Sequence, residues 1–158
     1  MFGFFRAAAY VDPTLGEFKR SGGLWRGKIK LAERVVPLSI SGPRAQPDAE
    51  AVAAAEALPT VWAQSSDSVA RALVEHLAPY REAVDAGEAE APSPPLPAVG
   101  QPGDIWASVQ VLSASVTPLS GKLTSEVALA AAWDDEHTLG ARFEGAAFVE
   151  LNGSILRE

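Results

Sequence analysis

The stretch Glu126-Val-Ala-Leu-Ala-Ala-Ala-Trp133-Asp-Asp-Glu-His137-Thr-Leu-Gly140-Ala-Arg-Phe-Glu144 joins an apolar run, a dense polar tip and a second alternating run. Apolar residues recur at every second position of the first run, at Val127, Leu129 and Ala131, which is the period of a strand with one buried face. Asp and neighbouring polar residues are preferred in tight turns. The stretch therefore predicts a β-hairpin whose turn is formed by residues 134–137.

A second alternation predicts another strand over residues 24–31. Every second position from residue 26 to 30 is basic, so one face is expected to meet the core and the other to meet water. The basic residues are Arg26, Lys28 and Lys30. Residues 15–20 and 35–41 predict the neighbouring strands. Pro37 cannot donate a ladder hydrogen bond, so its strand is expected at a sheet edge or with the nitrogen of Pro37 facing outward.

The middle of the chain predicts two helices. The Ala-rich residues 48–58 have helical propensity, and Pro59 is expected to end or kink this helix. The second helix is expected to begin near Ser66 and to carry an apolar stripe at helical spacing, with Pro79 bending or ending it. His76 lies beside that stripe, where a single histidine is more often a surface or packed side chain than a ligand.

The remaining segments complete one domain. The segment 87–103 is Pro-rich and predicts a surface crossing back to the sheet. Strands are expected again in the last part, with a hairpin turn at Asn152-Gly153 and a final strand over 154–156. The expected domain spans residues 1–158, with N-terminal strands in 1–41, a helical insertion in 47–86, the crossing in 87–103 and C-terminal strands in 104–158. The expected fold class is α+β: a twisted antiparallel β-sheet packed against two α-helices inserted after the third strand.

Composition narrows the function classes. The chain has no cysteine, which excludes disulfides, thiolate metal sites and Cys nucleophiles. No apolar run approaches the roughly 18 residues of a membrane span, and a cytoplasmic location without membrane contact is expected. The net charge of −7 is uneven, since residues 1–45 carry a net +5 and residues 46–158 a net −12. We expect no general nucleic-acid binding, because phosphate neutralisation requires surplus Lys and Arg.

The polar tip is the first candidate binding site. Its residues are Trp133, Asp134, Asp135, Glu136 and His137. Carboxylates beside an imidazole can bind a divalent cation or share a proton. Four consecutive residues do not all point one way, however, and a zinc site normally recruits a distant His or Cys. A plain turn, a recognition surface and a metal or acid–base site all remain open, and we assign no metal ligand and no cofactor.

A basic patch at Arg26, Lys28 and Lys30 is the second candidate. Its plain interpretation is a solvated strand face, while a nucleic-acid patch would predict steeply salt-dependent binding. The four tryptophans suit core packing or a pocket for a ligand or partner. No Gly-x-Ser-x-Gly elbow, Walker loop, Gly-x-Gly-x-x-Gly or His-Glu-x-x-His motif occurs. The sequence therefore assigns no catalytic residue.

Spaced motifs along most of the chain resemble a group of uncharacterised bacterial proteins. The motifs are Asp12-x-x-Leu-Gly-x-Phe18, Trp25-x-Gly27, Ile105-Trp106 and Trp133-Asp-x-Glu-His-Thr-Leu-Gly-Ala-x-Phe143, of which the last is the most specific. These families are known only as domains of unknown function, and members of some related groups are linked to toxin–immunity gene neighbourhoods. The resemblance implies an antiparallel sheet with a helical insertion. It brings no known reaction.

These observations favour a small non-catalytic protein-binding module of an immunity-like kind. Its acidic tip would meet a basic protein partner and steer the encounter. The alternative is a metal-binding protein or a hydrolase-type enzyme that uses the Asp134–His137 cluster, so the sequence leaves enzymatic activity open. An exposed sheet edge would also allow a homodimer.

Overall fold

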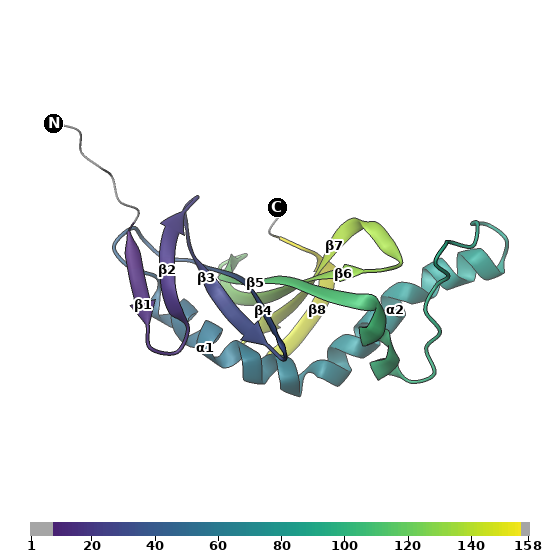
Figure 1. Ribbon diagram of the computed structural model, residues 1–158, viewed down its shortest axis with the longest axis horizontal. Helices are drawn as coiled ribbons and strands as arrows, with labels where there is room; N and C mark the ends of the chain where they lie inside the picture. The colour runs from purple at the N-terminus through teal and green to yellow at the C-terminus, as the bar shows by residue number, and fades with distance from the viewer. Residues whose placement is uncertain (1–7, 156–158) are drawn as a thin grey trace.

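Eight strands form one twisted β-sheet in the computed structural model, which describes residues 8–155 (Figure 1). The strands lie side by side in the order in which they occur in the chain. Neighbours are antiparallel except for β4 and β5, which are parallel. The strands are β1 (Ala9–Asp12), β2 (Gly16–Ser21), β3 (Leu24–Leu31), β4 (Arg34–Ile40), β5 (Val109–Leu119), β6 (Lys122–Ala131), β7 (Asp134–Glu144) and β8 (Ala147–Gly153).

Helices connect the parallel pair. They are α1 (Ala49–Gln64), α2 (Ser66–Asp85) and the short 3-10 helix η1 (Pro102–Ser108). Parallel strands need a long crossover connection, and this helical segment provides it. Helix α1 packs against β3 to β6, while α2 contacts η1 and β8 and projects beyond the sheet (Figure 1). Within residues 8–155, no helix combines the length and hydrophobicity that a membrane span requires.

The face of the sheet beneath the helices contains the hydrophobic core. The predicted alternation of β3 is confirmed, because Trp25, Ile29 and Leu31 are at most 3% exposed while the basic residues between them are exposed. Among residues 8–155, no helix covers the other face of the sheet, which we call the open face (Figure 1). Burial of each large apolar side chain contributes about 1.5–3 kcal/mol. The core therefore determines which face of each strand is left for polar groups.

The α+β class is confirmed, but the position of the helices in the strand order differs from the prediction. Strand β1 was not expected, so the helices follow the fourth strand rather than the third. A strand of four residues shows too few alternations to be recognised by its period. It is positioned by a tight turn in which a carboxylate oxygen of Asp12 accepts hydrogen bonds from the backbone N–H groups of Thr14 (2.9 Å) and Leu15 (2.8 Å).

Neither proline ends its helix, which was one of the two outcomes expected for each. Helix α1 continues through Pro59, and α2 continues through Pro79. A proline inside a helix removes one backbone hydrogen bond, but it does not remove the side-chain burial around it. Leu58 and Val61 flank Pro59 and are at most 7% exposed, and Leu77 near Pro79 is 3% exposed. Tertiary packing therefore keeps both helices intact.

Pro37 does not lie in an edge strand, because β4 is paired on both sides. It faces Lys28 on the β3 side, whereas the parallel ladder with β5 covers only Leu38 to Ile40. Pro37 therefore precedes the part of β4 that pairs with β5. A residue that lacks a backbone donor is tolerated at such an unpaired position.

The end of the chain also differs from the prediction. Asn152 and Gly153 do not form a hairpin turn but belong to β8, where they lie in register with Gly140 and Leu139 of β7. Pairing with β7 outweighs the local turn preference of Asn-Gly. The strand expected over 154–156 is absent at the residues that the structure describes, and Leu156 lies outside the described residues.

The Pro-rich segment runs without helix or strand from residue 90 to 100, as predicted. It returns alongside α2 (Figure 1), where a guanidinium nitrogen of Arg81 donates to the carbonyl of Pro97. Leu96 and Val99 pack against the core. The segment is therefore a fastened surface crossing that leads the chain from α2 to η1.

Candidate functional site

The β6–β7 hairpin is present, but its turn begins two residues earlier than predicted. Ala132 and Trp133 form the turn, and Asp134 already belongs to β7, in register with Ala131. Regular pairing resumes only at Leu139, opposite Leu129. Residues 135–138 therefore bulge out of the ladder, and we call them the tip loop.

Asp134 anchors the tip loop from inside. Its side chain is 5% exposed. One carboxylate oxygen accepts the hydroxyl of Tyr80 on α2 at 3.0 Å. The other lies 3.0 Å from the Nδ1 atom of His137 and accepts the backbone N–H groups of Glu136 and His137, each at 3.2 Å. The carboxylate thereby ties the tip loop to β7 and to α2.

Electrostatics keep this carboxylate ionised. Burial alone would raise the pKa of Asp134, but the hydrogen bonds from His137, from Tyr80 and from the backbone outweigh it and lower that pKa below its usual value. The hydrogen bond between Tyr80 and Asp134 shifts the pKa of Tyr80 in the opposite direction. Burial first, and then the bond to Asp134, raise the pKa of the Tyr80 phenol. Tyr80 therefore acts here as a hydrogen-bond donor and not as a base.

His76 joins the same cluster from α2. Its Nδ1 atom accepts the indole N–H of Trp133 at 2.9 Å, so the proton of the neutral ring resides on Nε2. That Nε2 atom lies 3.9 Å from the nearer oxygen of Asp134. His76 is thus a packed side chain, as a helical histidine was expected to be. No spacing in the sequence indicates that His76 and His137 approach one carboxylate.

The five predicted binding residues divide into two groups. Trp133 and Asp134 are buried, at 8% and 7% exposed, and hold the structure together. Asp135, Glu136 and His137 are exposed on the tip loop. Within residues 8–155, no group of three or more His, Asp or Glu side chains is arranged to hold a metal ion. The tip loop therefore presents two free carboxylates and one imidazole edge on a fixed support.

A second polar arrangement, which no sequence motif indicates, crosses the open face. Residues in register on successive strands point to the same face. They form a polar row across seven strands: Lys19, Arg26, Ser39, Ser115, Glu126, Arg142 and Glu150. The row is buried at its centre, where Ser115 is 2% exposed and Glu126 is 1% exposed.

Glu126 is saturated with donors. It accepts Nε of Arg142 at 3.1 Å, the hydroxyl of Ser154 at 2.6 Å and the backbone N–H of Ile155 at 3.2 Å. Gly140 on β7 makes the room, since a Cβ atom there would lie 2.5 Å from the Glu126 carboxylate. The segment that follows β8, at Ser154 and Ile155, is thereby fixed over the open face. The buried Glu126–Arg142 pair therefore has a structural role.

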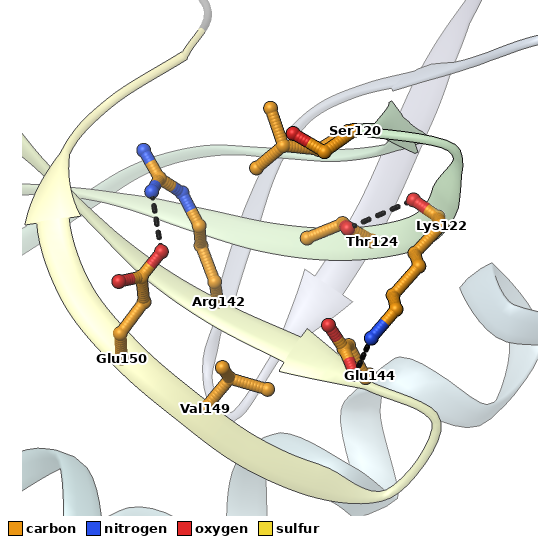
Figure 2. Close-up of a pocket in the computed structure, with 8 residues that line it drawn as sticks. Ser120, Lys122, Thr124, Arg142, Glu144, Val149 and Glu150 are labelled. Carbon is orange, nitrogen blue, oxygen red and sulfur yellow. Dashed lines mark hydrogen bonds and ion pairs between the residues drawn. The ribbon is translucent and has the colours of Figure 1, made fainter.

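A pocket of about 250 Å³ opens beside this pair, and Figure 2 shows the side chains that line it. Arg142 is directed toward Glu150, with 2.7 Å between Nη1 and the carboxylate. The Lys122 amine points toward Glu144 at 4.0 Å. Because each of these cations faces a carboxylate of the protein, the pocket offers no uncompensated charge to a ligand.

The predicted basic patch is present on β3. Arg26 is held in place, since Nε donates to the carbonyl of Ser21 (3.1 Å) and Nη1 to the hydroxyl of Ser39 (3.2 Å). Lys28 and Lys30 are exposed. The patch extends by one residue onto β2, because Lys19 lies in register with Arg26. The patch lies on β3 and the tip loop on β7, four strands apart in the sheet, and we treat them as separate sites.

Two tryptophans line a separate cleft. Trp62 of α1 and Trp106 of η1 pack edge to face, with ring centroids 5.5 Å apart. They border a cavity of about 700 Å³ together with the β3–β4 turn and the start of β5. Trp25, by contrast, is completely buried, and its indole N–H donates to the carbonyl of Pro43 at 3.0 Å. Trp25 therefore packs in the core, whereas Trp62 and Trp106 border a cleft.

Comparison with known proteins gives one match. A family model described as "Domain of unknown function (DUF6985)" matches residues 14–154, which is most of the chain. Neither the curated proteins nor the solved structures contain a match to this chain. The function must therefore be inferred from the geometry of the protein itself.

Proposed function

We propose that this chain, which belongs to the DUF6985 family of domains of unknown function, is a non-catalytic protein-binding module of an immunity-like kind. The tip loop is the binding element. Its partner is a protein with a basic surface, and both act in the bacterial cytoplasm. The acidic surplus of the chain, a net charge of −7, favours the approach of such a partner.

One observation carries the proposal. The carboxylate of Asp134 is hydrogen-bonded within the protein, to Tyr80, to His137 and to the tip loop backbone. The loop is therefore held in one conformation before binding, which lowers the entropic cost of association. Asp135 and Glu136 remain exposed on it. A rigid loop with two free carboxylates suits recognition of a cationic surface.

The test measures association after charge removal at the tip loop. Candidate partners are the proteins encoded beside the gene, screened by pull-down and measured by calorimetry. We expect one basic partner to bind, and Asp135→Asn/Glu136→Gln to weaken binding about tenfold or more, mainly through slower association at low salt. A matched variant, Glu33→Gln/Glu50→Gln, removes two exposed carboxylates elsewhere and should leave binding unchanged. Absence of any partner, or equal weakening by both variants, would contradict the proposal.

A second candidate function has one observation in its favour. The exposed ring of His137 is oriented by Asp134 through Nδ1, an arrangement that general bases also use. The alternative is a metal-binding protein or a hydrolase-type enzyme. Titration with zinc and other divalent cations, followed by thermal shift, separates it from the first candidate. Stoichiometric binding that disappears in His137→Gln would favour the alternative.

A further inference from the structure

The basic patch has no acidic side chain in register with it on β4, while on β2 the acidic residue Glu17 contacts Lys19. On the β4 side, Lys28 lies in register with Pro37 and Lys30 with Val35, neither of which is charged. On the β2 side, Arg26 lies in register with another cation. Within residues 8–155, none of the three basic side chains of β3 forms an ion pair with Asp or Glu.

Lys19 on β2 completes this group, which we call the cationic stripe: Lys19, Arg26, Lys28 and Lys30. The one acidic contact of the stripe is that of Lys19 with Glu17, at 3.9 Å and with both side chains more than half exposed. Like charges on one strand face destabilise a sheet, and alternate residues of a strand lie only about 6.6 Å apart. A bound anion would relieve this repulsion.

An apolar column runs beside the stripe on β4. Val35 is 60% exposed, and Pro37 is exposed as well. Adjacent strands lie about 4.8 Å apart, so the apolar column and the lysines form two parallel rows with the same repeat. An extended chain that lies along them presents its alternate side chains to the two rows. Acidic residues on one side and apolar residues on the other would meet both.

We propose that these two rows on the open face bind an acidic, extended segment of a partner protein. The exposed Val35 and Pro37 favour a peptide over a nucleic acid, because phosphate contacts would leave the apolar row without a partner. This surface is separate from the tip loop and opposite in charge, so the inference stands independently of the proposed function.

The experiment uses the full chain and a fluorescent peptide of alternating Glu and Val. We expect anisotropy to show binding that weakens with salt. Amide shifts in ¹⁵N spectra should change mainly in residues 26–30 and 35–39. Lys28→Gln/Lys30→Gln should weaken binding about three- to tenfold. Val35→Thr preserves shape and charge and should weaken binding as well, which a purely ionic contact would not predict.

Matched controls decide the outcome. Arg71→Gln/Lys122→Gln removes two positive charges elsewhere and should bind the peptide as the parent does. Equal weakening in this control, or shift changes centred away from β3 and β4, would overturn the proposal. So would an oligothymidylate that binds at least as tightly as the peptide. Self-association in sedimentation that is lost in Lys28→Gln/Lys30→Gln would identify a second copy of the chain as the occupant and overturn it too.

Discussion

At the scale of single residues, Gly140 shows how a buried charge is accommodated. A Cβ atom at this position would lie 2.5 Å from the carboxylate of Glu126, which accepts hydrogen bonds from Arg142, Ser154 and Ile155. We predict that Gly140→Ala lowers the free energy of unfolding by about 1–3 kcal/mol, as overpacking does. Gly153→Ala is the matched strand control, because a Cβ there meets nothing within 4 Å. Urea denaturation of both variants checks this, and equal midpoints would contradict it.

Residue-scale patterning explains what the sequence could predict. The alternation in β3 follows from burial of one face, so its core-facing residues and exposed cations were identified correctly, whereas β6 is buried on both faces from Thr124 to Leu129. The Glu126–Arg142 pair was not identified, because the burial of Glu126 depends on Gly140 of the neighbouring strand and on Ser154 after β8. A charged residue at an alternate position of an otherwise small and apolar strand is the one local signal that could have drawn attention to it.

At the scale of elements, the tip loop depends on α2. The two are separated by more than 50 residues, and Tyr80, His76 and Asp134 meet only because α2 passes beside the hairpin. Periodicity predicts that a helix and a hairpin exist, but not which of their polar faces meet. This explains why the tip could be predicted as a polar candidate site while its anchoring partners on α2 could not.

The anchor makes a prediction about pH. The folded-state pKa of Asp134 is lowered, so its contribution is present above the unfolded value of 3.8 and is lost as pH falls through the folded pKa. Asp134→Asn should therefore cost about 2 kcal/mol at neutral pH, and the gap to the parent should narrow as the solution is acidified. Asp12, whose pKa is also lowered, titrates in both proteins and cancels in the difference. Urea midpoints from neutral pH down to about 3 measure the gap, and a constant gap would contradict the prediction.

At the scale of the whole molecule, two charge effects compete, and one substitution separates them. Lys28→Glu changes the net charge from −7 to −9, since one positive charge becomes negative, and this increases global repulsion. It also places an anion within the cationic stripe, which relieves local repulsion. Because screening acts over about 10 Å at 0.1 M salt, the neighbouring charges should dominate. We therefore predict that Lys28→Glu raises the melting temperature at low salt by a few degrees and that added NaCl reduces the gain.

Lys122→Glu makes the same change in net charge beside Glu144 and should lower the melting temperature instead. If both variants lose stability equally, net charge and not the stripe governs the electrostatics of this fold, and the stripe would hold no repulsion for a partner to relieve.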